Sequence, residues 1–200
     1  QLAKGRKPAT VHRGVQFIIH TSKSLLLQVF LEEEGFTEMN NAKDTPKLDK
    51  EKQRKQKNKI KIIMIQQVEF SLRPLPRGFH LVTSEVMRNL PSLPKTGILN
   101  LFVQHTSCGL SINENFDPDV RYDLKGIFER LVPDGDPRYL HQDEGPTDMS
   151  AHAKSTMVGV SLTIPITNGR LNLGTWQGIY LCEFREGGGS RHLVATIIGE

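Results

Sequence analysis

A change in composition near residue 60 decides which part of this chain can build a hydrophobic core. Residues 37–60 are rich in Lys, are mostly polar and contain no aromatic residue, so burial cannot offset the entropy lost on ordering them. Residues 1–60 carry 13 Lys and Arg against 7 Asp and Glu, whereas residues 61–200 carry 13 against 15. We therefore expect a basic, low-complexity, flexible extension over residues 1–60 and a folded domain over residues 61–200. The net charge of +4 therefore arises from the basic extension, because the domain itself is mildly acidic. We expect no nucleic-acid binding by the domain.

From residue 61 onward the pattern becomes that of strands and short helices. Val68, Phe70 and Leu72 alternate with polar residues, which is typical of a strand with one buried face. Asp117 followed by Pro118 predicts the start of a helix, because an Asp cap and a first-turn proline both favour it. Together these patterns predict an α+β fold, a compact and mostly antiparallel β domain with two or three helices. The expected strands cover residues 62–72, 78–82, 98–103, 110–112, 162–166, 170–173, 179–184 and 192–198, and the other expected helices cover residues 83–90 and 150–158.

Two polar runs follow predicted strands, at positions where functional sites usually form. Residues 105–119 concentrate imidazole, hydroxyl, amide and carboxylate groups directly after an apolar strand. Residues 174–178 place the only tryptophan of the chain between two glycines. These runs indicate a polar pocket, as an enzyme would have. The chain contains no phosphate-binding loop, dinucleotide-binding fingerprint, Cys-x-x-Cys pair or serine-hydrolase elbow.

Three histidines of the predicted domain lie in polar loops or at the ends of elements: His105, His141 and His152. Three neutral imidazoles suit a divalent metal such as zinc and leave one coordination position open for catalysis. Their spacings of 36 and 11 residues match no local ligand motif. The alternative is that each histidine hydrogen-bonds its own loop.

Several other side chains could act on a substrate, and each has a structural alternative. Asp119 and Asp123 share one helix face, which favours a facing cation such as a metal or a basic partner, or else a solvated face. Glu114 stands at a strand end as a candidate general acid or base. Trp176 is either a core anchor or a platform on which a substrate stacks. Arg191 either binds a phosphate or is an ordinary surface charge.

The cysteines and the apolar segments bear on the location of the protein. Cys108 and Cys182 lie in apolar, strand-like surroundings, and two lone cysteines form no disulfide framework. We therefore expect buried free thiols and a cytoplasmic location. Residues 15–31 are apolar but interrupted by polar side chains, so we expect no membrane span.

Taken together, these segments resemble the YjbQ family, also called the secondary thiamine-phosphate synthase family. The resemblance covers about residues 65–199 and is carried by the order and spacing of five runs: His105-Thr106-Ser107, Asn113-Glu114-Asn115, Asp117-Pro118-Asp119-Val120, Ala151-His152-Ala153-Lys154 and Gly174-Thr175-Trp176-Gln177-Gly178. The resemblance implies a compact α+β fold and a homotrimer with polar pockets near the subunit interfaces. It also implies a weak thiamine-phosphate synthase activity, which joins a pyrimidine diphosphate to a thiazole phosphate and releases pyrophosphate. Under this resemblance the three histidines would meet in the pocket and hold a metal.

The leading hypothesis is therefore a metal-dependent transferase that acts on a phosphorylated small molecule. His105, His141 and His152 would hold a divalent ion, either zinc or magnesium. The expected catalytic residues are Glu114 and Asp119, as acid/base or water-positioning groups, and Lys154, which would offset phosphate charge. The expected substrate-binding residues are Thr106, Ser107, Asn113, Asp123, Thr175, Trp176, Gln177 and Arg191. The alternatives are a metal-dependent hydrolase of phosphate-type metabolites and a non-enzymatic trimeric protein that binds a metabolite.

Overall fold

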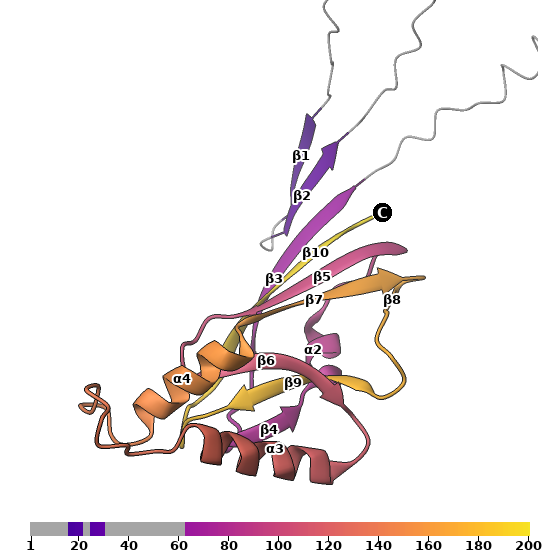
Figure 1. Cartoon of the computed structure of the whole chain (residues 1–200). Helices are drawn as coiled ribbons and strands as arrows, with labels where there is room; N and C mark the ends of the chain where they lie inside the picture. The colour runs from indigo at the N-terminus through magenta and orange to yellow at the C-terminus, as the bar shows by residue number, and fades with distance from the viewer. Residues whose placement is uncertain (1–15, 22–24, 31–62) are drawn as a thin grey trace, which may run out of the picture.

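The computed structural model describes residues 16–21, 25–30 and 63–200 (Figure 1). Two antiparallel sheets form its body, a larger one in the order β3-β10-β5-β7-β8 and a smaller one in the order β4-β9-β6. The predicted mostly antiparallel α+β fold is confirmed. The strands of the two sheets are β3 (Met64–Leu72), β4 (Gly78–Leu81), β5 (Thr96–Val103), β6 (Cys108–Glu114), β7 (Ser161–Thr167), β8 (Arg170–Leu171), β9 (Gln177–Glu183) and β10 (Arg191–Gly199).

The main core lies between the two sheets, where the alternating residues of each strand meet. Leu99 and Leu101 of β5, Leu193 of β10 and Leu181 of β9 have no exposed surface and belong to one hydrophobic cluster. Because successive residues of a strand point to opposite faces, the intervening side chains turn toward the outer faces of the sheets. The alternation in the sequence therefore predicts which face of β3, β5, β7 and β10 is buried, whereas β9 is buried on both faces.

A second, smaller core lies on the other face of the smaller sheet, against helix α3 (Pro118–Leu131). Phe79 of β4 packs against Phe128 of α3 with ring centroids 5.2 Å apart. The helix starts where the sequence predicts, because the Asp117 side chain accepts a hydrogen bond from the Asp119 amide at 2.9 Å. Figure 1 shows α3 running below β4.

Helix α4 (Asp148–Val158) begins two residues earlier than the sequence pattern predicts. Its buried Ser155 hydroxyl donates to the Cys108 carbonyl of β6 at 2.6 Å and docks the helix on the start of that strand. The third helix, α2 (Thr83–Asn89), follows β4 as expected. No helix in the described part of the chain is both long and apolar enough to cross a membrane.

Two local predictions are also met in the described residues. Asn168 and Gly169 both take positive φ, 52° and 73°, as the tight β7–β8 turn requires. Cys108 and Cys182 are both buried and free.

Within the expected N-terminal extension, β1 (Gln16–Thr21) and β2 (Leu25–Phe30) pair antiparallel. The rest of residues 1–60, with its predicted flexibility, lies outside the described residues.

Candidate functional site

His141, Asp148 and His152 form a cluster that could hold a metal ion, and we name it the histidine–aspartate cluster. Asp148 and His152 lie one turn apart on α4, and His141 comes from the loop before the helix. The Oδ2 atom of Asp148 lies 2.7 Å from His141 Nε2 and 3.0 Å from His152 Nε2. One ligand atom from each residue falls within 4.8 Å of the others, and the Asp148 carboxylate is buried. Within the described part of the chain, this is the one group of three such residues.

The hydrogen bonds of His152 call for a proton or a metal ion between its ring and the Asp148 carboxylate. Its Nδ1 lies 3.0 Å from the Thr106 carbonyl oxygen, which can only accept, so Nδ1 carries the ring proton. In the neutral ring, Nε2 then presents a lone pair to the lone pairs of Asp148 Oδ2, 3.0 Å away. Two lone pairs at that distance repel unless a proton or a metal ion lies between them. A backbone carbonyl on the far nitrogen is also the usual way in which a protein orients a metal-binding histidine.

A cavity of about 310 Å³ lies beside the cluster, and we name it the arginine cavity. Two arginines, Arg185 and Arg191, lie in its wall with hydroxyl groups and a glycine loop. The predicted Thr106, Ser107 and Arg191 all line it, together with His152 of the cluster. The complete lining is Thr106, Ser107, Glu144, Asp148, His152, Arg185, Gly187, Gly188 and Arg191.

A buried ion pair holds Arg191, one of the residues that line the arginine cavity. Glu183 has no exposed surface, and its two carboxylate oxygens accept from Nε and Nη2 of Arg191 at 2.6 Å each. Burial alone would lower the pKa of Arg191, but the Glu183 hydrogen bonds raise it, so the guanidinium stays charged. A Cβ at Gly188 would lie 2.3 Å from Arg191 Nη2 and 2.8 Å from Glu183 Oε1, so only glycine fits above the pair. The pair therefore fixes both Arg191 and the glycine loop.

His105 lies outside the histidine–aspartate cluster, so the expected set of three histidines is not brought together. Its Nε2 accepts from the His192 amide at 2.8 Å, and its ring stacks on that of His192 with centroids 5.4 Å apart. Its Nδ1 lies 3.3 Å from Nη1 of Arg191. Burial, and then the positive charge of Arg191, lowers the pKa of His105. Asp148, which sequence reasoning missed, takes the third position instead.

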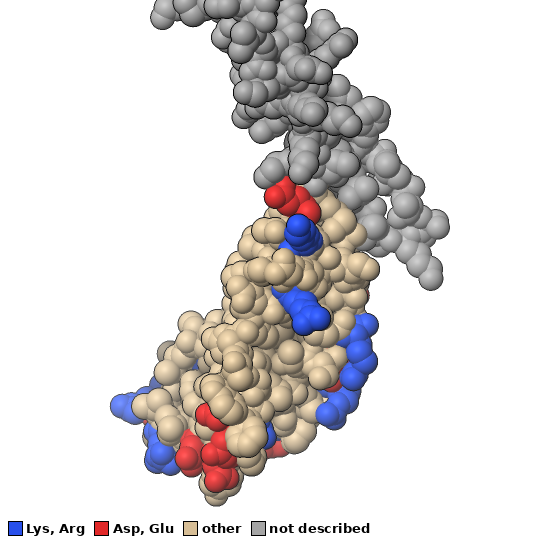
Figure 2. Space-filling view, turned by 90° about the vertical axis from the view of Figure 1, so that its right-hand side faces the viewer, with Lys and Arg blue, Asp and Glu red and all other residues tan. Residues whose placement is uncertain are grey.

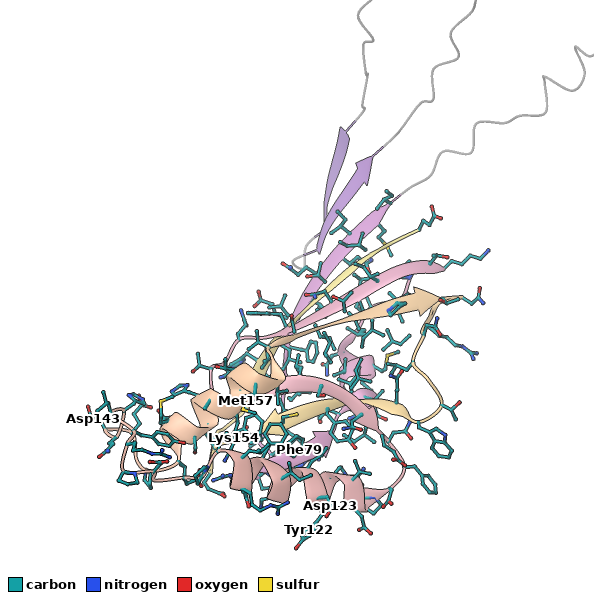
Figure 3. All side chains as sticks on the ribbon, viewed as in Figure 1. Phe79, Tyr122, Asp123, Asp143, Lys154 and Met157 are labelled. Carbon is teal, nitrogen blue, oxygen red and sulfur yellow. The ribbon has the colours of Figure 1, made fainter. Side chains whose placement is uncertain are left out.

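Lys154 is buried on the side of α4 that faces α3 and β4, and it does not line the arginine cavity (Figure 3). Its Nζ lies 3.5 Å from Asp134 Oδ1 and makes no hydrogen bond within the described residues. Burial, and then the nearby Arg77, lowers the pKa of Lys154. This placement gives no support to the predicted catalytic role of Lys154.

The other predicted residues gather at the far end of β6, and we name this region the acidic–aromatic end. Trp176 and Phe116 are 59% and 73% exposed, and their rings make an edge-to-face contact with centroids 5.4 Å apart. The Asn115 side chain holds their loop by donating to the carbonyls of Thr175 and Gln177 at 3.2 and 3.0 Å. The predicted residues at this end are Asn113, Glu114, Asp119, Asp123, Thr175, Trp176 and Gln177.

On the acidic side of this end, the Glu114 backbone is held by hydrogen bonds and the Asp123 side chain is exposed. The Glu114 amide donates to the Asn113 side-chain oxygen at 2.8 Å, and the Glu114 carbonyl accepts from the Tyr180 hydroxyl. Asp123 is exposed and projects from α3 away from the sheets (Figure 3). Figure 2 shows acidic side chains gathered at the lower end of one face, over the start of α3.

The two groups of predicted residues therefore lie at opposite ends of β6 and β9. Cys108, at one end of β6, pairs with Glu183, and Glu114, at the other end, pairs with Gln177. The ends are about 20 Å apart, because a strand rises about 3.3 Å per residue. No single small ligand in the arginine cavity can contact both groups of one chain.

Sequence reasoning missed five residues of the lining, which are Glu144, Asp148, Arg185, Gly187 and Gly188. Asp148 stands four residues before His152, and this spacing on one helix face was the available signal. Arg185 contacts the second oxygen of Asp148, Oδ1, and lies 3.9 Å from Glu144 Oε2. Its place after β9 follows from the topology of the sheet, and no local motif marks it.

Comparisons with known proteins cover most of the folded part. A family model described as UPF0047 protein YjbQ-like matches residues 68–200. The chain is 48% identical over 136 residues to UPF0047 protein YjbQ of Escherichia coli O157:H7, which covers 67% of this chain and 98% of that protein. It is 50% identical over 132 residues to UPF0047 protein YjbQ of Salmonella typhimurium, which covers 65% of this chain and 95% of that protein.

Solved structures give the same match. A conserved hypothetical protein from Thermus thermophilus superposes with a TM-score of 0.57 at 38% identity, over 64% of this chain and 97% of that one. An uncharacterised conserved protein of the YjbQ/UPF0047 family from Clostridium acetobutylicum gives a TM-score of 0.55 at 35% identity, over 65% and 98%.

Proposed function

The chain belongs to the UPF0047 YjbQ-like family, and on that premise we propose that it is a zinc-assisted transferase of the thiamine-phosphate synthase type. The reaction joins a pyrimidine diphosphate to a thiazole phosphate and releases pyrophosphate. The observation that carries the proposal is the histidine–aspartate cluster in direct contact with a cavity that holds two arginines. A cation site beside fixed guanidinium groups suits a reaction whose main need is to neutralise a leaving diphosphate.

The donor set favours zinc over magnesium. Two imidazole nitrogens and one carboxylate oxygen suit zinc, whereas magnesium prefers an octahedral shell of oxygen atoms. His141, Asp148 and His152 would supply three ligands and leave a position open for a substrate oxygen. When bound, the ion would act as a Lewis acid on the departing phosphate oxygens.

The residues around the cluster would bind and orient the substrate. Arg191, held by Glu183, would present its remaining N–H groups to a phosphate oxygen, and Ser107 and Thr106 would add hydroxyl donors. The Thr106 carbonyl would keep the His152 ring in the tautomer that leaves Nε2 free for the ion.

Glu114 and Asp119 can take part only if a second subunit supplies them, and we therefore include a homotrimer in the proposal. The acidic–aromatic end exposes Phe116 and Trp176, and on α3 Tyr122 and Leu131 are 78% and 62% exposed. Exposed apolar groups of this size favour a subunit interface. If the acidic–aromatic end of one copy met the arginine cavity of the next through a threefold rotation, the head-to-tail contacts would close into a ring of three.

An activity assay with matched variants tests the catalytic part of the proposal. We would measure pyrophosphate release by the full chain from the pyrimidine diphosphate and the thiazole phosphate, with zinc present. Asp148→Asn should lower the rate at least about 100-fold, because the carboxylate is a metal ligand. Asp143→Asn is the control, since this exposed loop residue makes the same chemical change outside the cavity. Equal rates in both variants would refute the role of the cluster.

Subunit complementation tests the composite site. Asp148→Asn and Glu114→Gln chains, each inactive alone, should regain part of the activity after they are unfolded and reassembled together. The hybrid oligomers would then contain some sites that combine an intact cluster with an intact Glu114. No recovery in oligomers that have reassembled would contradict a shared site.

A metal-dependent hydrolase is the second candidate, because an open position on a zinc ion also suits water activation. Turnover of the pyrimidine diphosphate without any thiazole acceptor would favour this candidate. Tight binding of a phosphorylated metabolite without turnover would instead favour a non-enzymatic trimeric binding protein.

A further inference from the structure

The charges around the arginine cavity nearly cancel, and their balance depends on a metal ion. Arg191 is neutralised by the buried Glu183 beneath it. Arg185 faces two carboxylates, Asp148 and Glu144. With neutral histidines the group as a whole carries one net negative charge, and a divalent ion on the cluster would turn this into one net positive charge. An anion should therefore be repelled before the metal binds and attracted afterwards.

Arg185 is the residue whose partners compete with a bound anion. Its Nη1 contacts Oδ1 of Asp148 and lies 3.9 Å from Oε2 of Glu144, which is 64% exposed. A metal ion on Oδ2 of Asp148 draws negative charge away from that carboxylate and weakens its attraction for the guanidinium. Because the Arg185 side chain is 24% exposed and borders the cavity, it can turn toward a ligand there.

The glycine loop supplies a further donor of the kind that a tetrahedral anion needs. Gly187 takes a positive φ of 65°, and its amide donates to no group among the described residues. Both glycines line the cavity opposite the hydroxyls of Thr106 and Ser107. A free backbone amide next to a guanidinium is a typical part of a phosphate-binding arrangement.

We propose that the arginine cavity is a phosphate or diphosphate site whose affinity rises when the histidine–aspartate cluster binds its metal, with Arg185 passing from Asp148 to the anion. This inference rests on the metal site of the proposed function and adds the coupling between metal and anion. Metal and anion then bind with reciprocal coupling, so each raises the affinity for the other by the same factor.

The test is calorimetric titration of inorganic phosphate into the full chain, once stripped of metal by a chelator and once loaded with zinc and dialysed. Zinc should tighten phosphate binding at least about tenfold, within the usual range of coupling between two sites. Equal phosphate affinity with zinc demonstrably bound would overturn the coupling and leave the metal site standing. A chain that binds no zinc would overturn the metal site and this inference with it.

Variants of Arg185 test its part in the coupling. Arg185→Gln should bind zinc at least as tightly as the wild type, since a neighbouring cation is gone, but should lose the gain in phosphate affinity. Arg185→Lys keeps the positive charge and should retain part of the gain in phosphate affinity. This variant shows whether the effect of Arg185→Gln comes from the lost charge or from a folding defect. Arg138→Gln is the control, because that exposed arginine pairs with Asp136 outside the cavity. Full coupling in a folded Arg185→Gln protein would contradict the role of Arg185.

Discussion

The buried ion pair beneath the arginine cavity offers the sharpest test of the energetics. Glu183 has no exposed surface and Arg191 is 4% exposed, so neither charge has water to replace its partner. Glu183→Gln keeps the shape of the side chain but removes its charge. One amide oxygen then has to satisfy a guanidinium that two carboxylate oxygens now bind at 2.6 Å each. The Arg185 amide also loses a charged acceptor, which lies 2.9 Å away.

The expected cost follows from the burial of the pair. Removing one partner of a buried salt bridge destabilises a protein by about 3–5 kcal/mol, because the remaining charge is left uncompensated. We expect the lower end of that range, about 3 kcal/mol, since glutamine can still accept one hydrogen bond. For a chain of this size, that free energy lowers the Tm by about 6–12 °C.

The assay is urea unfolding, followed by circular dichroism, of the metal-stripped full chain. Asp136→Asn is the control, because it breaks an ion pair with Arg138 at a similar distance of 2.6 Å but with an exposed arginine, and it should leave the midpoint nearly unchanged. The double variant Glu183→Gln with Arg191→Met should recover part of the loss, because no buried charge remains. A cost below about 1 kcal/mol for Glu183→Gln would refute the argument from burial.

Two further predictions concern charges that the site does not use. Lys154→Met should leave the free energy of unfolding unchanged or raise it, because the buried ammonium lies 3.5 Å from its one ion-pair partner, Asp134, which keeps its hydrogen bonds to Arg77. Because the pKa of Lys154 is lowered in the folded state, wild-type stability should rise with pH in the alkaline range below 10.5, and urea unfolding of the variant should lack this rise. The lowered pKa of His105 predicts that stability falls as the pH drops below 6.5, where the unfolded chain binds a proton that the folded chain does not. His105→Gln should reduce the dependence of the unfolding free energy on pH below 6.5. An acid profile equal to that of the wild type would contradict the role assigned to His105.

Much of the fold could be predicted because its signals are local. The alternation of Val68, Phe70 and Leu72 identifies β3, and the Asp117 cap marks the start of α3 in both sequence and structure. The Asn168-Gly169 pair fixes the β7–β8 turn through its positive φ values. These features depend on neighbouring residues, so physical rules for short segments suffice.

The candidate site depended on register and topology, which no short segment encodes. His105 was expected to bind a metal, but the start of β10 places His192 and Arg191 against its two ring nitrogens. Lys154 was expected in the pocket, but it lies on the side of α4 that faces Asp134. The sequence pattern predicts one pocket for all of these residues, whereas the length of β6 separates them into two groups. Only the path of the strands could reveal these separations.

Zinc binding by matched variants of the full chain tests the central claim most directly. After removal of metal by a chelator, the zinc content and affinity of each chain would be measured by competition with a chromophoric chelator. We expect about one zinc ion per wild-type subunit, held by the three ligands of an open site. We also expect a large loss of zinc affinity in Asp148→Asn and little change in His105→Gln. Zinc bound equally well by Asp148→Asn, or lost from a folded His105→Gln chain, would contradict the assignment of the histidine–aspartate cluster.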